Sequence, residues 1–273
     1  MLPPIKDWDD AFANMAYIPG SKTLPDRWAA KALAYRNRAH RIEHDIAYGH
    51  HPRERFDLVL PDTTPKGIMV FIHGGYWMLL DRSFWTHLAE GARAHGWAVC
   101  LPSYTLTPEA RIGEITTQIG TCVNQVSHLV DGPIRICGHS AGGHLAARMA
   151  CNDTPLSPAV LARVVHSVSI SGVHDLRPLL HTAMNDTLHL DEDEALRESP
   201  ALLRPATAAP LTTWVGEKER PEFIRQAQLM AQIWAGLDVA TACIIEPDQD
   251  HFSVLDSLCD PGSSLIRCIL GMT

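Results

Sequence analysis

The sequence predicts a single α/β domain over residues 1–273, built on a mostly parallel central sheet with helices on both faces. Two observations support this class. Short apolar segments typical of buried strands alternate with helical segments along most of the chain, as expected for parallel strands joined by helical crossovers. A Gly-x-Ser-x-Gly pattern also stands between one predicted strand and the helix after it. With 273 residues and 46% apolar residues, the chain has ample material for one large core.

The predicted elements follow one another along the chain. Helical character begins around 26–39, and two short strands are expected at 41–47 and 55–60. Further apolar segments are expected to be strands: 66–75, 97–102, 133–140, 164–173, 211–217 and 241–250. Other segments have helical patterns: 83–96, 112–130, 141–150, 220–236 and 262–271. The alternation of these two sets indicates parallel strands covered on both faces.

Residues 174–208 interrupt the alternation, because they have helical character but follow no strand of their own. We interpret them as a small helical lid over one end of the sheet. The acidic run Asp191–Glu194 is interpreted as the solvated first turn of a lid helix, where carboxylates interact favourably with the helix dipole.

Composition and charge argue against several classes of protein. The formal charge of −8 disfavours a nucleic-acid surface or an anionic membrane surface. The N-terminal MLPPIKDWDD lacks the basic and apolar regions of a secretory signal, and no apolar run approaches the roughly 18 residues of a membrane span.

Seven irregularly spaced cysteines without a CxxC pair predict buried free thiols in a reducing cytoplasm. Fifteen histidines show no metal-binding spacing, so neither a metal nor a cofactor is expected.

Ser140 is the candidate nucleophile. It is the central residue of Gly138-His139-Ser140-Ala141-Gly142, which follows a predicted strand and opens a predicted helix. A serine on such a sharp turn is forced outward, and small residues two positions before and after it let the turn close. The alternatives are an ordinary glycine-rich turn or a phosphate-binding loop. However, the Gly-Lys-Ser/Thr of a Walker loop is absent, and a dinucleotide fingerprint belongs at the first strand.

His251 is the candidate general base. A serine hydroxyl is a poor nucleophile unless a base takes its proton. In folds with this serine turn, the order along the chain is serine, acid, histidine. His251 follows the last predicted strand in a loop before a short helix, whereas the other histidines after residue 172 belong to 174–208. We therefore expect His251 to act first as base and then as acid.

Three carboxylates compete for the role of the acid that orients His251. Glu219 is preferred because it stands just before the helix that follows strand 211–217. Glu217 and Asp175 stay open as alternatives, although Asp175 has the position of a cap for the first lid helix. The acid is expected to hold the imidazole tautomer and to stabilise the imidazolium.

The segment HGGYW at 73–77 is the candidate anion-stabilising loop. Attack on a carbonyl creates an oxyanion, which needs fixed N–H donors, and glycines let the backbone approach it closely. In folds with this serine turn, one donor follows the nucleophile and the others come from an HGG-type loop. The expected oxyanion hole consists of the N–H groups of Gly74, Gly75, Tyr76 and Ala141.

Three side chains are candidate substrate-binding groups because they flank this loop or the nucleophile: Tyr76, Trp77 and His144. Aromatic rings at the edge of the site would suit an aromatic leaving group. Packing in the core is the alternative interpretation for Trp77 and for His144.

Four motifs together resemble those of the kynurenine formamidase (arylformamidase) group of α/β-hydrolases, whose relatives include bacterial carboxylesterases. They are HGGYW at 73–77, GHSAGGH at 138–144, VGEKERPEF at 215–223 and DHF at 250–252. The resemblance covers most of the chain and implies an α/β-hydrolase fold. In that group the acid stands at the position of Glu219. Vertebrate relatives have aspartate there, so the glutamate is a departure.

The resemblance implies hydrolysis of N-formyl-L-kynurenine to L-kynurenine and formate, without a cofactor. The alternative is a carboxylesterase acting on short-chain acyl esters, because the same groups can cleave either bond. We expect a small-molecule substrate and neither a nucleic-acid nor a membrane partner. A homodimer is compatible with the sequence, which does not determine the oligomeric state.

Overall fold

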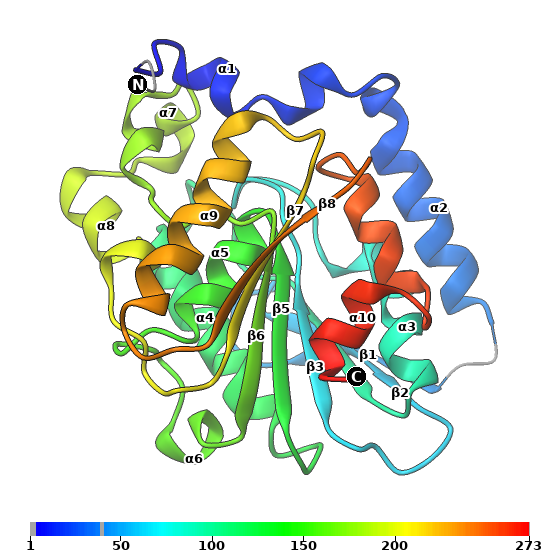
Figure 1. Cartoon of the computed structure of the whole chain (residues 1–273). Helices are drawn as coiled ribbons and strands as arrows, with labels where there is room; N and C mark the ends of the chain where they lie inside the picture. Colours follow the sequence, from blue (N-terminus) through cyan, green and yellow to red (C-terminus); the bar gives the residue numbers. More distant parts are fainter. Residues whose placement is uncertain (1–3, 39–40, 273) are drawn as a thin grey trace.

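An eight-stranded sheet forms the centre of the structure, a computed structural model that describes residues 4–38 and 41–272 (Figure 1). The strands are β1 (Arg41–Ala47), β2 (Arg55–Leu60), β3 (Ile68–Ile72), β4 (Ala98–Pro102), β5 (Ile134–His139), β6 (Val164–Ile170), β7 (Leu211–Gly216) and β8 (Thr241–Glu246). Their order in the sheet is β1-β2-β4-β3-β5-β6-β7-β8. β2 is antiparallel to both of its neighbours, and every other adjacent pair is parallel. The predicted α/β class and mostly parallel sheet are confirmed.

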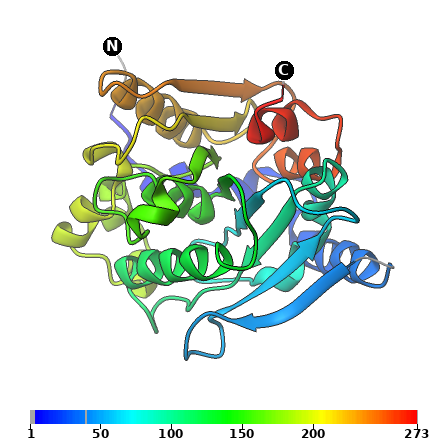
Figure 2. The same ribbon diagram turned by 90° about the horizontal axis from the view of Figure 1, so that it is seen from below.

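Helices cover both faces of this sheet (Figures 1 and 2). The helices are α1 (Trp8–Phe12), α2 (Leu24–Arg36), α3 (Glu90–Ala94), α4 (Ile112–Val126), α5 (Ala141–Arg148), α6 (Pro158–Leu161), α7 (Asn185–Leu188), α8 (Glu192–Arg197), α9 (Pro221–Ala235) and α10 (Ser264–Leu270). α4, α5 and α9 pack on one face, and α2, α3 and α10 pack on the other. Side chains alternate along the strands: Val70 and Ile72 join the first core, whereas Met69 and Phe71 join the second.

Several predicted helices differ from the structure in their bounds. The segment 83–96 is not one helix, because 3₁₀ turns at Arg82–Phe84 and Thr86–Ala89 precede α3. The break falls at Trp85, whose buried ring lies 4.8 Å from that of Trp28 between centroids. Tertiary packing therefore overrides the helical pattern there. α2 ends at Arg36, before residue 39 of the predicted segment, which lies outside the described residues.

The insertion 174–208 consists of α7, α8 and 3₁₀ turns at Arg177–His181 and Pro200–Leu202. Asp191 caps α8 by accepting a hydrogen bond from the Glu194 N–H at 2.8 Å, so the acidic run forms the first turn of a helix as predicted. The run is not solvated throughout, because Glu194 is buried and pairs with the Arg111 guanidinium. Glu198, just after α8, pairs with the Arg148 guanidinium at 2.9 Å and accepts a hydrogen bond from Thr116 at 2.8 Å. These contacts attach the insertion to α4 and α5.

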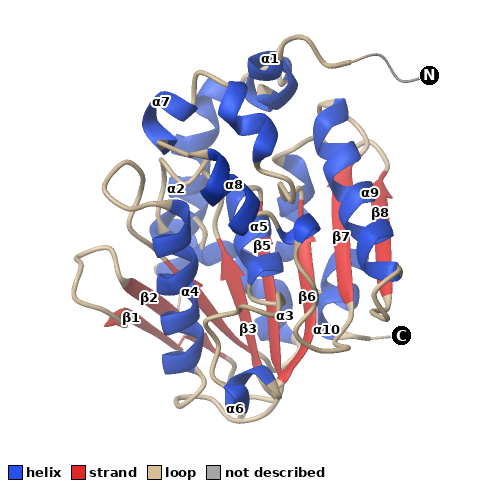
Figure 3. Cartoon of the chain, turned by 90° about the vertical axis from the view of Figure 1, so that its left-hand side faces the viewer, coloured by secondary structure: helices blue, strands red, loops and turns tan. Residues whose placement is uncertain are grey.

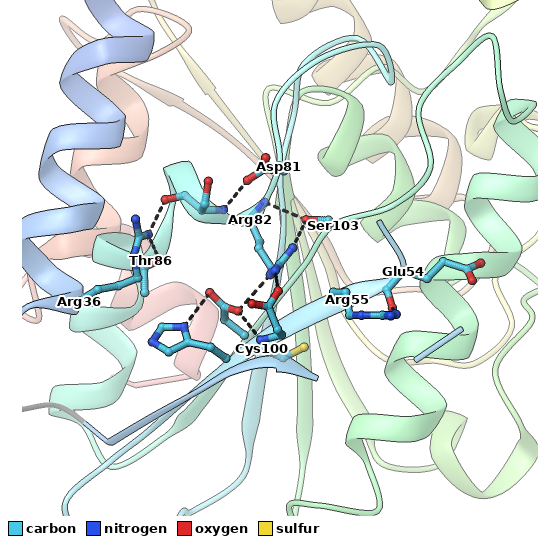
Figure 4. A network of polar contacts seen from close by, with 12 residues as sticks. Arg36, Glu54, Arg55, Asp81, Arg82, Thr86, Cys100 and Ser103 are labelled. Atoms are coloured by element: carbon cyan, nitrogen blue, oxygen red, sulfur yellow. Dashed lines mark hydrogen bonds and ion pairs between the residues drawn. The ribbon is translucent and has the colours of Figure 1, made fainter. Parts of the chain in front are cut away.

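A polar network attaches the segment before α3 to the antiparallel edge of the sheet (Figure 4). The Arg82 guanidinium lies 3.0 Å from the buried Asp57 carboxylate and 3.2 Å from the Ser103 hydroxyl. Arg36 at the end of α2 donates to the Thr86 hydroxyl at 2.8 Å. α2 is thereby held beside the loop that follows β3.

The N-terminal part of the chain crosses the end of the sheet where the parallel strands terminate, with α1 beyond their carboxyl ends (Figure 3). Ligands bind at the carboxyl ends of strands in open α/β sheets, so this part of the chain lies where a site is expected. None of the helices in residues 4–38 and 41–272 combines the length and the apolar character needed to cross a membrane.

Candidate active site

Ser140 lies on a strained turn between β5 and α5. Its φ of 55° and ψ of −117° are unfavourable for a residue with a side chain, and its N–H donates to the Ile170 carbonyl at 2.8 Å. A Cβ on Gly142 would collide with the Ile72 carbonyl, and one on Gly138 would collide with the Gly142 carbonyl. The small residues predicted at both positions are therefore required by close backbone approach.

His251 and Glu219 form a buried pair. His251 Nδ1 lies 2.6 Å from Glu219 Oε2, and the two residues are 2% and 5% exposed. The other carboxylate oxygen accepts hydrogen bonds from the Ser171 hydroxyl at 2.5 Å and from the Gly216 N–H at 2.8 Å. These donors stabilise an ionised carboxylate away from water. The arrangement suits an acid that holds an imidazole in place.

The alternative acids lie elsewhere. Glu217 is exposed and accepts a hydrogen bond from the Asp248 N–H at 3.1 Å. Asp175 lies 2.8 Å from the Arg177 guanidinium and also accepts from the Arg177 N–H, so its carboxylate is held at the start of the insertion. The Arg177 guanidinium lowers the pKa of the Asp175 carboxyl against the opposing effect of burial. Among the three candidates, the geometry favours Glu219.

His139 packs against His251 in the loop after β8. One of its ring nitrogens lies 2.7 Å from the His251 carbonyl oxygen, and the two ring centroids are 4.6 Å apart. Burial lowers the pKa of His139 well below its usual value, which favours a neutral ring that donates to that carbonyl. Phe223 and Phe252 enclose the His251 ring at centroid distances of 4.7 and 5.1 Å. Sequence reasoning gave no role to either phenylalanine, or to Ser171, because their contacts with this site come from packing between distant segments.

The HGGYW loop runs directly over the nucleophile. A Cβ on Gly74 would lie only 3.0 Å from Ser140 Cβ. Gly75 has a φ of 116°, and its carbonyl accepts hydrogen bonds from the Met78 and Leu79 N–H groups at 2.9 Å each. Tyr76 also has a positive φ of 56°. This tight turn brings Gly74, Gly75 and Tyr76 beside Ser140, while Ala141 begins α5. The arrangement supports the proposed group of N–H donors.

Ser140 and His251 both line an apolar pocket with a volume of about 90 Å³. Its walls come from the HGGYW loop with the segment after it, from the turn that contains Ser140, and from the loop that contains His251. The N-terminal segment, which we define as residues 7–28, forms the remaining wall. The contribution of that segment consists of Met15, Pro25 and Trp28. Tyr76 lines the pocket, and its hydroxyl donates to the Phe12 carbonyl at 3.2 Å. The pocket lining includes no residue of 174–208, so the lid function of that insertion stays a prediction.

Trp77 and His144 are corrections to the predicted substrate-binding set. They are 2% and 0% exposed, and neither lines the pocket at Ser140. Their rings contact each other edge to face at 5.2 Å, and a ring nitrogen of His144 lies 2.6 Å from the Glu198 carbonyl oxygen. The positive φ of Trp77 turns its side chain into the core instead of toward the pocket. Burial lowers the pKa of His144 to about 3, which favours a neutral ring.

The described residues contain no group of three or more His, Cys, Asp and Glu side chains arranged to hold a metal ion. All seven cysteines are free thiols. Cys100, Cys122, Cys137 and Cys151 are buried, and burial raises the thiol pKa of Cys151 to about 12. A thiol with a raised pKa is a poor nucleophile, so Ser140 is the better candidate.

The fold and this site define a class of hydrolase. A sequence profile described as the alpha/beta hydrolase family matches residues 69–265. A kynurenine formamidase from Danio rerio is 30% identical over 84% of this chain and 80% of its own length. The chain belongs to the α/β-hydrolase family. Within that family, it is a hydrolase of the kynurenine formamidase and carboxylesterase type.

Solved structures share the same fold. A candidate thioesterase from a Silicibacter species is 46% identical and superposes with a TM-score of 0.92 over 97% of this chain and 100% of that chain. Esterase B from Lactobacillus rhamnosis is 19% identical, with a TM-score of 0.68 over 94% of this chain and 91% of that chain. At that low identity, the second similarity concerns the fold alone.

Proposed function

We propose that this hydrolase removes the formyl group of N-formyl-L-kynurenine, giving L-kynurenine and formate. The main observation is the buried His251–Glu219 pair beside Ser140 at the bottom of a small apolar pocket. The similarity to a kynurenine formamidase over most of both chains supports the choice of substrate.

In the proposed mechanism, Ser140 Oγ attacks the formyl carbon while the free ring nitrogen of His251 takes the hydroxyl proton. Glu219 stabilises the resulting imidazolium. The N–H groups of Gly75, Tyr76 and Ala141 stabilise the oxyanion, and each such donor typically contributes roughly 3–4 kcal/mol. His251 then protonates the departing arylamine, which leaves a formyl ester on Ser140. Water, activated by His251, hydrolyses that ester to formate and restores the serine.

The pocket fits a small acyl group joined to an aromatic leaving group. A formyl group is the smallest acyl group, so it needs the least room beside Ser140 in a pocket of about 90 Å³. Aromatic rings line the rest of the pocket: Trp28, Tyr76, Trp85 and Phe252. Such rings pack well against an aryl amine.

A short-chain carboxylesterase is the second candidate. The apolar lining of the pocket also suits a short-chain acyl ester, and an ester needs less help with its leaving group than an anilide. A thioester presents the same acyl carbon, and the Silicibacter protein at 46% identity is named as a candidate thioesterase.

The deciding experiment compares kcat/KM for N-formyl-L-kynurenine, p-nitrophenyl acetate and a short-chain acyl thioester on purified protein. We expect the formamide to be the best substrate. Ser140→Ala is expected to abolish all three activities and to keep the thermal melting transition, because only one oxygen atom is lost. Fast ester cleavage without deformylation would refute the formamidase proposal, and turnover by Ser140→Ala would refute the nucleophile.

We further propose a cytoplasmic location. Seven free thiols support a reducing compartment. Localisation of a tagged chain tests this proposal. A homodimer and the absence of a nucleic-acid partner stay predictions. Light scattering coupled to gel filtration measures the first, and a binding assay with labelled DNA and RNA measures the second.

A further inference from the structure

A second cavity adjoins the pocket at Ser140. It measures about 170 Å³ and lies between the N-terminal half of α2 and the loop that contains His251. Trp28 and Phe252 line both cavities, and their ring centroids are 5.2 Å apart. These two rings therefore separate the cavities. A substrate larger than the pocket of about 90 Å³ at Ser140 would reach the second cavity only by displacing the Trp28 or Phe252 ring.

The second cavity is polar, in contrast to the pocket at Ser140. Four charged side chains line it: Arg27, Lys31, Asp250 and Asp256. Lys31 Nζ lies 2.8 Å from Asp256 Oδ1, so these two charges compensate each other. Among the residues that the structure describes, no carboxylate pairs with the Arg27 guanidinium.

Asp250 supplies the opposite charge on the other wall. Its Oδ1 accepts hydrogen bonds from the Phe252 and Ser253 N–H groups at 2.9 Å each, which holds the carboxylate in a defined orientation. A carboxylate has about four lone-pair directions, so Asp250 can accept further bonds. The cavity thus presents one unpaired cation and one oriented anion on opposite walls, next to the aromatic pocket.

We propose that this cavity binds the zwitterionic α-amino acid group of the substrate. The Arg27 guanidinium binds the α-carboxylate, and the Asp250 carboxylate accepts from the α-ammonium. This inference rests on the proposed function, because N-formyl-L-kynurenine carries its α-amino acid group at the end of a short ketone side chain, attached to the ring carbon next to the formamide. The formanilide end occupies the aromatic pocket at Ser140. Guanidinium–carboxylate pairs are strong and directional, so Arg27 would also set the orientation of the substrate.

The test compares two formamides that differ in the amino acid group. N-formyl-L-kynurenine has it, and formanilide has the same scissile bond without any charge. We expect Arg27→Gln to lower kcat/KM for N-formyl-L-kynurenine about tenfold more than kcat/KM for formanilide, since one charge-assisted contact is lost. Arg27→Lys keeps the positive charge but loses the planar pair of donors, and is expected to recover only part of that difference. Arg38→Gln, an exposed arginine just after α2 and outside this cavity, is the matched control and should alter neither rate.

The outcomes separate the two proposals. Equal losses on both formamides in Arg27→Gln, or no loss on either, would refute the amino acid subsite while the deformylase stands. A wild-type enzyme that cleaves p-nitrophenyl acetate but neither formamide would refute the formamidase proposal itself, and the subsite with it. Arg27 is exposed and its side chain pairs with no described carboxylate, so the variant is expected to fold, which circular dichroism checks.

Discussion

Glu219 shows how a single buried carboxylate is compensated. Its side chain has no solvent-exposed surface, and the carboxylate oxygens instead accept from His251, Ser171 and Gly216. An ionised carboxylate in this setting stabilises a protonated imidazole and fixes which ring nitrogen faces Ser140. A neutral amide of the same shape would support neither role.

We therefore expect Glu219→Gln to lower kcat by a factor on the order of 10⁴, as found when a triad acid becomes an amide. The matched control is Glu217→Gln, two residues earlier, where the side chain is exposed and we expect a change of less than about twofold. Steady-state kinetics on the best substrate measures both. A larger loss of kcat in the Glu217 variant would show that the assignment of Glu219 as the acid is wrong.

At the scale of elements, the N-terminal segment is attached to the catalytic loops by Arg220, the residue after Glu219. The Arg220 guanidinium pairs with Asp10 and lies 3.9 Å from the centre of the Tyr17 ring, and the Arg220 N–H donates to Asn14 at 2.9 Å. The segment also provides three residues of the pocket lining, Met15, Pro25 and Trp28. Substrate binding should therefore depend on this attachment.

Arg220→Ala should raise KM by roughly 3- to 10-fold, because the N-terminal segment then spends less time in the position where it lines the substrate pocket. The effect on kcat should be smaller, because the guanidinium contacts the N-terminal segment and not the reacting atoms. Limited proteolysis should also cut the N-terminal segment sooner. Lys218→Ala, which removes an exposed pair with Asp248, is the control. An unchanged KM and cleavage pattern would argue against the attachment.

The conformation of the turn at Ser140 also depends on the close contact between α5 and β3 at Gly142. We expect Gly142→Ala to destabilise the protein by about 1–3 kcal/mol or more, because the new methyl group meets the Ile72 and His73 carbonyls. Gly236→Ala, where the nearest atom would be 3.4 Å away, should change the free energy of unfolding by less than about 1 kcal/mol. Urea denaturation compares the two, and similar midpoints would refute the packing argument.

At the scale of the whole molecule, buried histidines make stability depend on pH. His144 and His174 are fully buried, and burial lowers the pKa of each to about 3 from 6.5. In the unfolded chain both bind protons below about pH 6.5, but in the folded chain they do not until about pH 3. Stability is therefore lost as pH falls through that window.

His174→Leu tests this dependence, since both ring nitrogens of His174 lack a hydrogen-bond partner among the described residues. The free energy of unfolding of the wild type should fall more steeply than that of the variant between about pH 6.5 and pH 4. The expected difference in slope is about 1.4 kcal/mol per pH unit, one proton's contribution. His181→Gln, at an exposed position, should keep the wild-type slope. Equal slopes in wild type and His174→Leu would contradict the prediction.

The sequence by itself determined the class of fold and the order of the candidate catalytic groups. Buried parallel strands need continuous apolar runs, so their positions can be read locally. The turn at Ser140 needs small residues at positions 138 and 142, which is again a local requirement, and His251 was placed by its position after the last strand.

Only the tertiary structure decided which carboxylate meets His251 and what encloses the substrate pocket. Glu217 and Glu219 are two residues apart, and their burial depends on how the loop after β7 packs against Ser171. Met15 and Trp28 approach Ser140 across more than a hundred residues of chain, and Trp77 and His144 turn into the core instead. Contacts between segments so far apart depend on three-dimensional packing, which no local pattern of residues encodes.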